Sequence, residues 1–174
     1  ASPALAPVRI LHTADWHLGQ SLHGVSRAWE HAQFLEWLLD EVARREVDAL
    51  VVAGDVFDVA SPSAEAQAQY FGFLADARRR FPRLDIVVVG GNHDAPARLD
   101  AARAVLDALG VRVVGGLPRR ADGSWDLQRL LVPLTDASGR EAARLVALPF
   151  LRPKDLPRDL TEARALAGLA PAAP

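Results

Sequence analysis

The sequence predicts an α/β fold built on a mainly parallel sheet. One unit, an apolar run followed by a polar loop and an amphipathic segment, occurs three times in succession. The apolar runs have the length of strands, and the amphipathic segments have helical spacing. Successive strand–helix–strand units give parallel strands joined by right-handed crossovers, so we expect helices on at least one face of the sheet.

The first unit begins with the apolar run 8–11 and continues into an amphipathic segment from Ser26 to about Arg45. Phe34, Leu38 and Val42 recur in that segment at intervals of one helical turn. This spacing predicts a helix that buries one stripe of side chains against the sheet.

The second unit begins with the apolar run 49–53, which predicts a buried strand. Ser61 is a candidate N-cap for the helix that follows, and Pro62 suits the first helical position because its missing N–H costs nothing there. Phe81-Pro82 predicts the end of this helix.

The third unit begins with the apolar run 86–89 and passes through Gly90-Gly91. A helix is predicted from about Pro96 to Leu109, closed by Gly110, and a short strand over 111–114 follows it.

After residue 126 the pattern changes to that of a hairpin. Two strand-like segments, 127–134 and 143–148, flank a turn over 136–139. They predict the beginning of a second, antiparallel sheet. Beyond Pro149 the chain is rich in proline and then in alanine and leucine, which predicts at most a short helix.

The composition is that of a globular protein. Of the 174 residues 50% are hydrophobic and 24% charged, which argues against a disordered chain. The absence of cysteine excludes disulfides and thiolate metal sites. A formal net charge of −2 gives no overall electrostatic case for binding nucleic acid. We see no secretion signal and no apolar run long enough for a bilayer, so we expect a cytoplasmic protein without a membrane partner.

Each of the first three predicted strands ends in residues that bind metals. These residues form three clusters along the chain: Asp15 and His17; Asp55 and Asp58; Asn92, His93 and Asp94. The carboxyl ends of neighbouring parallel strands share one edge of a sheet, so we expect the clusters to converge.

Oxygen and nitrogen ligands without sulfur suit manganese, iron or zinc better than magnesium. Two such ions about 3.5–4 Å apart would hold a phosphate and lower the pKa of a bridging water. His93, next to a candidate ligand but not itself on the metal, is placed to protonate a leaving oxygen.

The motifs D-x-H at 15–17, G-D-x-x-D at 54–58 and G-N-H-D at 91–94, taken in order, resemble the first three motifs of the calcineurin-like metallophosphoesterases. The segments 10–19, 52–58 and 148–153 are similar to the bacterial SbcD-type nuclease subunits. This resemblance covers the chain from Val8 to about Leu156.

The resemblance implies a four-layer αββα sandwich, of which the chain would form the N-terminal portion. It implies a centre of two divalent ions, most often Mn²⁺, that cleaves DNA phosphodiesters near ends. DNA and an SbcC-type coiled-coil ATPase would be the partners, in DNA repair.

The resemblance also assigns roles to the residues of the three motifs. Asp15 and His17 would bind the first ion, and Asp55 would bridge both ions. Asn92 would bind the second ion, while His93 would position the phosphate and protonate the leaving group.

Two more carboxylates, Asp58 and Asp94, would orient the loops and the His93 ring. The family pattern continues with Gly-His and Gly-His-x-His motifs, but no histidine follows His93. We therefore interpret residues 1–174 as a metallophosphoesterase domain that is incomplete at its C-terminus. For the chain alone we expect weak or single-site metal binding and little nuclease activity. An unpaired edge of the second sheet would favour self-association, so a homodimer is expected.

Two alternatives stay open at this point. The same fold could act on a small phosphodiester or phosphomonoester, or the chain could be a non-catalytic module. The basic stretches 78–80, 119–120 and 152–154 are more typical of solvated helix ends and turns than of a DNA surface, so no DNA-binding residue is predicted. Of the remaining histidines, we expect His12 in the core or behind the ligands, and His23 and His31 on the surface or on a helix face.

Overall fold

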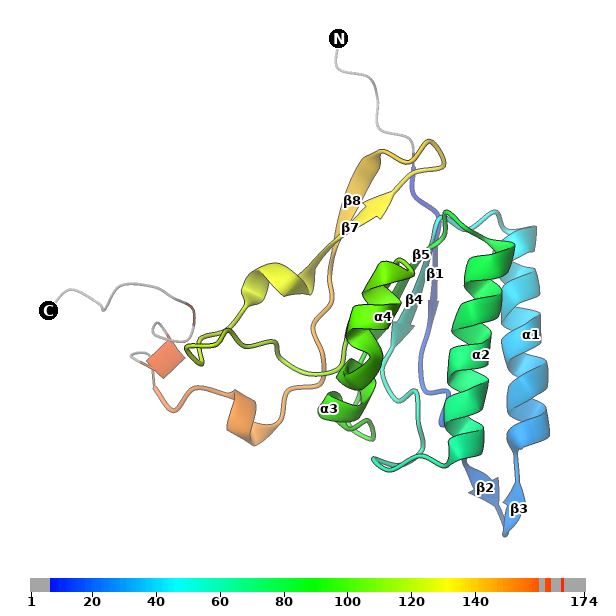
Figure 1. The fold of residues 1–174 in the computed structure, drawn as a ribbon, viewed down its shortest axis with the longest axis horizontal. Coiled ribbons are helices and arrows are strands. Elements are labelled where there is room, and N and C mark those ends of the chain that lie inside the picture. Colours follow the sequence, from blue (N-terminus) through cyan, green and yellow to red (C-terminus); the bar gives the residue numbers. More distant parts are fainter. Residues whose placement is uncertain (1–6, 160–161, 164–166, 168–174) are drawn as a thin grey trace, which may run out of the picture.

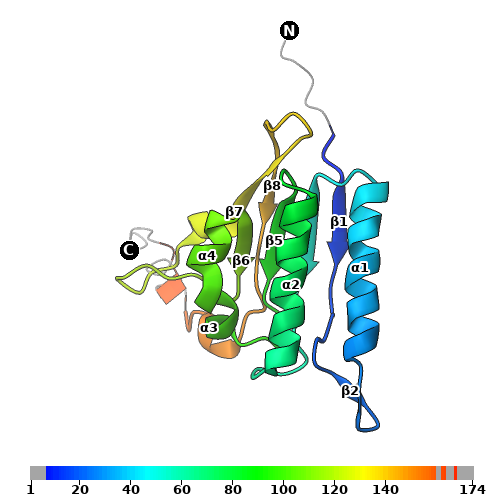
Figure 2. The same ribbon diagram turned by 45° about the vertical axis from the view of Figure 1, so that its right-hand side comes forward.

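The computed structural model describes residues 7–159, 162–163 and 167. Its centre is a parallel sheet of four strands in the order β1-β4-β5-β6 (Figure 1). The strands are β1 (Ile10–Thr13), β4 (Ala49–Ala53), β5 (Asp85–Val89) and β6 (Val111–Val114). Helices α1 (Ala28–Arg44), α2 (Ala64–Arg80), α3 (Pro96–Leu99) and α4 (Arg103–Ala108) lie on one face of it (Figure 2). The predicted α/β class with a parallel first sheet is confirmed.

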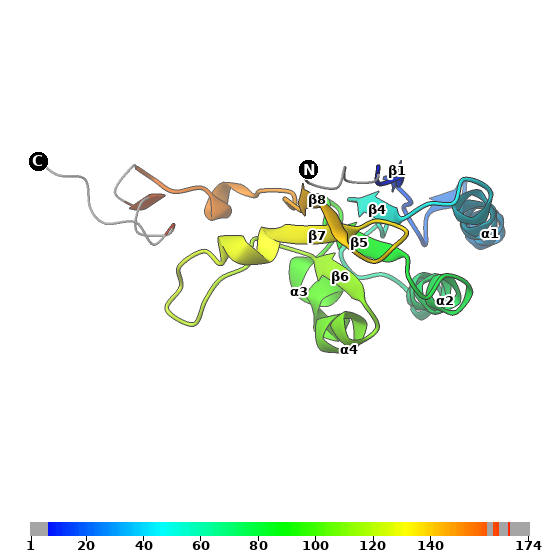
Figure 3. The ribbon, with the colours of Figure 1, turned by 90° about the horizontal axis from the view of Figure 1, so that it is seen from above.

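A second sheet covers the face that the helices leave free. Strands β7 (Leu131–Thr135) and β8 (Glu141–Val146) pair antiparallel, and Figure 3 shows them on the opposite side of the first sheet from α2 and α4. The Asp85 carboxylate at the start of β5 accepts hydrogen bonds from the Thr135 N–H at 2.6 Å and hydroxyl at 2.9 Å. The order of layers is helix, sheet, sheet, as the sandwich requires.

The central strands are buried on both sides, which explains why their sequences are continuous apolar runs. Leu50, Val52 and Val88 belong to the core beneath the helices. Val87 and Val89 point the other way and pack against β7 and its neighbours. The first sheet is therefore a firm base for the polar loops that leave its carboxyl edge.

Helix α2 begins at Ala64, so the predicted start at Ser61 is wrong. The N-cap is Ser63, whose hydroxyl accepts the Ala66 N–H at 3.1 Å. Two serines flank Pro62, and the second one reaches the third helical N–H, which satisfies a donor that the first serine would leave open. The predicted end holds, since Phe81 is the C-cap.

The helix predicted over 96–109 is broken. A 3₁₀ turn, η1 (Asp100–Ala102), separates α3 from α4. The Asp100 carboxylate accepts the Gly115 N–H at 3.1 Å, so a tertiary bond to the end of β6 competes with a continuous helix. Gly110 does close α4, with φ of +74°.

The hairpin prediction is right in topology but not in its first strand. Residues predicted as strand from 127 form a 3₁₀ turn, η2 (Leu127–Leu130), and β7 begins only at Leu131. A further hairpin, β2 (Ser21–Leu22) with β3 (Val25–Ser26), was not predicted, because two residues per strand show no periodicity.

At the C-terminal end, a 3₁₀ turn η3 (Pro153–Asp155) follows the proline-rich stretch. The predicted helix over the alanine- and leucine-rich end lies mostly outside the described residues. Of the helices in the described part, none combines the length and apolar character needed to cross a bilayer.

Candidate metal centre

The loops that follow β1, β4 and β5 touch one another at the carboxyl edge of the sheet. The Asp15 N–H donates to the Gly54 carbonyl at 3.1 Å, and the His17 N–H donates to the Asp55 carbonyl at 3.0 Å. The His93 N–H donates to the Asp55 carboxylate at 2.9 Å. Three clusters that are far apart in sequence thus form one site.

Two overlapping groups of side chains could each hold a cation. Asp15, His17 and Asp55 place one ligand atom each within 4.8 Å of one another, and so do His17, Asp58 and His93. His17 belongs to both groups. In the described part of the chain, no lysine or arginine forms an ion pair with these three carboxylates, so their negative charge is left for a cation.

Asn92 is exposed and lines the same hollow as Asp15 and Asp55. Its amide oxygen is therefore on the solvent side of the group formed by Asp15, His17 and Asp55. The hollow also contains His12. His12 is exposed, so the expected place in the core or behind the ligands is wrong.

Three residues of the site adopt the left-handed conformation that side chains rarely take. The φ angles are +56° at Asp15, +47° at His17 and +50° at Asp55. Such conformations persist where the surroundings enforce them, and they concentrate at functional sites. Here the backbone bonds between the loops enforce them, and the turns bring the three side chains together.

Gly91 allows the loops after β4 and β5 to approach closely. A Cβ at this position would lie 2.1 Å from Oδ1 and 2.3 Å from the backbone nitrogen of Asp55. Neither atom can move without disturbing Asp55, since its carboxylate also accepts the His93 N–H. The glycine is a steric requirement of the site.

Asp94 fixes both loops from beneath. Its side chain is buried, with 1% of the residue exposed. The carboxylate accepts the N–H groups of Val56 at 3.2 Å, Phe57 at 3.0 Å and Gly91 at 2.9 Å. Asp94 thus does what was expected of it, which is to orient the loops rather than to bind an ion.

The two histidines of the site differ in their hydrogen bonding. His93 Nδ1 lies 2.7 Å from the Asp58 backbone carbonyl, which fixes Nδ1 as the protonated nitrogen and frees Nε2. This bond to the Asp58 carbonyl, more than the nearby carboxylates, raises the His93 pKa. His17 Nδ1 is 3.3 Å from the Asp58 carboxylate but outside hydrogen-bond geometry. The two rings meet edge to face, with centroids 4.9 Å apart.

These observations fit a divalent cation. His17 Nδ1 is buried and has no hydrogen-bond partner among the described residues, and the adjacent carboxylates carry no cationic partner there. A cation would satisfy both. The donors are carboxylate, imidazole and amide, which is the set that transition ions accept.

The other histidines and the basic stretches lie outside this arrangement. His23 is exposed at the β2–β3 turn, whereas His31 is buried on α1, and burial lowers its pKa. Arg79 pairs with Asp76 on its own helix, and Arg119 donates to the Gly123 carbonyl of its own loop. The basic side chains of 78–80 and 119–120 thus serve local structure.

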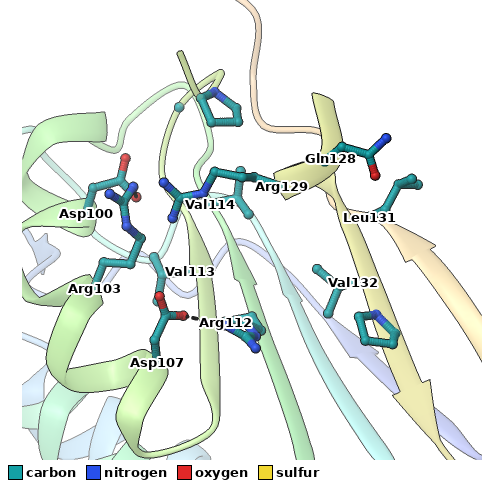
Figure 4. Close-up of a pocket in the computed structure, with 13 residues that line it drawn as sticks. Asp100, Arg103, Asp107, Arg112, Val113, Val114, Gln128, Arg129, Leu131 and Val132 are labelled. Atoms are coloured by element: carbon teal, nitrogen blue, oxygen red, sulfur yellow. Dashed lines mark hydrogen bonds and ion pairs between the residues drawn. The ribbon is translucent and has the colours of Figure 1, made fainter. Parts of the chain in front are cut away.

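A second hollow lies between α4, the edge strand β6 and the segment of η2 and β7 (Figure 4). Arg103 and Arg129 both point toward Asp100 in it, and burial raises the Asp100 pKa. Arg112 pairs with Asp107 at 3.0 Å. None of the residues that line it belongs to the three motifs, so the chemistry is placed at the carboxyl edge and not here.

The model of the calcineurin-like phosphoesterase family matches residues 8–163. The chain belongs to this family. The match covers every residue of the metal centre, and members of the family bind divalent metals, which agrees with the two groups of candidate ligands.

Three curated relatives are each named as the D subunit of the nuclease SbcCD. That of Rhodobacter capsulatus is 53% identical over 150 residues, 86% of this chain and 37% of the relative. That of Escherichia coli is 40% identical over 149 residues, 86% and 34%. That of Bacillus subtilis is 44% identical over 108 residues, 62% and 27%. The chain spans about a third of the length of the first two relatives.

One solved structure, a nuclease MPE of Pseudomonas putida, aligns with a TM-score of 0.41 and 22% identity over 65% of this chain and 50% of that one.

Proposed function

We propose that the protein to which this chain belongs is a metal-dependent nuclease that hydrolyses DNA phosphodiesters in the processing of DNA ends. The observation that carries the proposal is the meeting of Asp15, His17 and Asp55 with Asn92 and His93 at one sheet edge. The family and the names of the relatives support it. Because the chain spans about a third of those relatives, the activity is assigned to the full-length protein.

Asp15 and His17 would hold one ion, Asn92 a second, and Asp55 would lie between them. Mn²⁺ is the proposed metal, since the donors include imidazole nitrogen as well as oxygen. Two such ions would supply an activated water and neutralise charge on the phosphate. The peptide N–H of His93 holds the Asp55 carboxylate in place at 2.9 Å.

His93 would hold and move a proton at Nε2. Its Nδ1 is tied to the Asp58 carbonyl, so the ring presents Nε2 at the exposed side of the site. A histidine fixed in this way can donate a proton to the leaving oxygen of the substrate. The Asp58 and Asp94 side chains would position the ligands without meeting the substrate.

An SbcC-type coiled-coil ATPase, a homodimeric arrangement and a cytoplasmic location are further parts of the proposal. They rest on the names of the relatives and on the bacterial setting of the DNA that those nucleases process.

A nuclease assay on the full-length protein with linear DNA and Mn²⁺ tests the proposal. Asp55→Asn and His93→Gln are each expected to lower kcat at least about 100-fold. Asp76→Asn, the same kind of exchange at an exposed carboxylate on α2, is the matched control and should leave kcat unchanged. Unimpaired cleavage by either site variant would refute the assignment.

Calorimetry adds a readout that does not depend on turnover. Mn²⁺ titrated into the same proteins should show binding that Asp55→Asn weakens and His93→Gln retains. Hydrolysis of a chromogenic phosphodiester without any action on DNA would instead show an enzyme for small substrates.

A further inference from the structure

The segment 148–153 has no part in the chemistry described above, although it brings an aromatic ring to the metal centre. Phe150 and Leu148 line the same hollow as Asp15, Asp55 and Asn92. Both are unusually open for apolar residues, with 46% of Phe150 and 53% of Leu148 exposed. The wall of the hollow that faces the candidate ligands is thus apolar.

Phe150 is held through its backbone and through its ring. Its backbone N–H donates to the Gly90 carbonyl at 2.9 Å, one residue before Gly91. The guanidinium of Arg152 lies 5.7 Å from the ring centroid and donates to the Asp94 carbonyl at 2.7 Å. The ring is therefore tied to the loop that carries Asn92 and His93.

The Arg152 residue is itself fixed by its surroundings. The Arg152 N–H donates to the Asp155 carboxylate at 3.0 Å, which anchors the start of η3. A guanidinium near an aromatic ring adds a cation–π attraction. Several bonds thus keep one exposed phenyl ring beside a polar site, and packing of the core does not need that ring.

We propose that Phe150 is a stacking platform for a nucleobase of the substrate strand, with Leu148 as its apolar neighbour. The proposal rests on the proposed function, since it requires a nucleic acid at the metal centre. Stacking on an aromatic face is tolerant of sequence because every base has a π-face. It also requires that the base is unpaired, because a base inside a duplex offers no free face. The substrate at this site is then a single strand or a frayed end, and a phosphomonoester without a base binds without help from Phe150.

The test compares Phe150→Leu, Phe150→Trp and the control Trp29→Leu in the full-length protein. Trp29 is 71% exposed on α1 and does not line the hollow. On a single-stranded oligonucleotide with Mn²⁺, Phe150→Leu should lower kcat/KM about 5- to 150-fold. Phe150→Trp and Trp29→Leu should stay close to the wild type.

Oligonucleotides with one abasic residue, moved one position at a time, locate the stacked base. At one position near the cleaved bond the wild type should lose as much as Phe150→Leu loses, and the two proteins should become equal. Fluorescence anisotropy without metal should show the same pattern in the dissociation constants, since stacking does not require cleavage.

The platform is overturned if Phe150→Leu matches the wild type, if Phe150→Trp falls as far as Phe150→Leu, or if the loss persists at every abasic position. A wild type that cleaves no DNA refutes the proposed function instead, so the two failures are distinct.

Discussion

The carboxylate of Asp94 accepts the backbone N–H of Phe57 at 3.0 Å, across 37 residues of sequence. The same carboxylate accepts the N–H groups of Val56 and Gly91. Asp94 therefore joins the loop after β4 to the loop after β5 below the metal centre. It is a buried anion whose charge is balanced by peptide dipoles rather than by a cationic side chain.

Asp94→Ala should destabilise the fold strongly, since it leaves three buried N–H groups without an acceptor. At roughly 1–3 kcal/mol for each unsatisfied group, we expect a loss of about 3 kcal/mol or more in the free energy of unfolding. Urea titration measures it. Asp122→Ala is the matched control, because Asp122 also accepts a backbone N–H but lies on the exposed surface. Equal losses in the two variants would contradict this account.

Gly91→Ala should disrupt the site, because the added Cβ would lie 2.1 Å from Asp55 Oδ1. We expect weaker Mn²⁺ binding in calorimetry together with a lower unfolding midpoint. Gly72→Ala provides the contrast. Gly72 lies inside α2 with open space around its Cβ position, so alanine should stabilise the protein by about 0.5–1 kcal/mol. Similar outcomes for both alanines would be incompatible with the close approach at Gly91.

Asp58→Asn should weaken metal binding without displacing His93. The Asp58 carboxylate lies 3.3 Å from His17 Nδ1, whereas His93 bonds to the Asp58 backbone carbonyl, which the substitution keeps. Loss of a partner that orients a metal ligand typically costs about 10- to 100-fold in affinity. Mn²⁺ calorimetry measures the loss, and an affinity unchanged within about twofold would show that His17 needs no orienting carboxylate.

Glu41→Gln should remove a pH-dependent part of the stability. Hydrogen bonds from the side chains of Arg44 and then Arg45 lower the Glu41 pKa from 4.5 to about 2. A carboxyl with a depressed pKa in the folded state stabilises it above the unfolded value, and that contribution is lost as the pH falls from about 4.5 toward about 2. The wild type should therefore exceed the variant in urea midpoint near neutral pH, and the gap should close in that acid range. A gap that stays constant with pH would exclude this ion pair as its cause.

The fold could be predicted as far as local pattern determines it. The apolar runs at 49–53 and 111–114 became strands with those bounds, because a strand buried on both faces needs an uninterrupted apolar sequence. The break between α3 and α4 could not be predicted, since it depends on a bond from Asp100 to Gly115, which lies beyond the helix. Nor could the start of α2, where two serines compete for one cap.

The convergence of the three motifs followed from the rule that parallel strands share a carboxyl edge, and the structure brings the loops together there. What the spacing did not reveal was how the loops are held. The bond from the His93 N–H to Asp55 depends on tertiary geometry, and so does the position of the Phe150 ring over the same hollow. The aromatic residue in the segment 148–153 was the available signal, but its sequence alone does not say which loop it faces.

The left-handed residues at positions 15, 17 and 55 set the fold and its chemistry at odds. A glycine would adopt those angles freely, so the backbone alone would favour losing the side chains on which the site depends. Selection for a sturdier scaffold would therefore tend to erase the site, and only selection for its use keeps an imidazole and two carboxylates there. Among relatives that have given up the chemistry, glycine is the replacement to expect first at these turns.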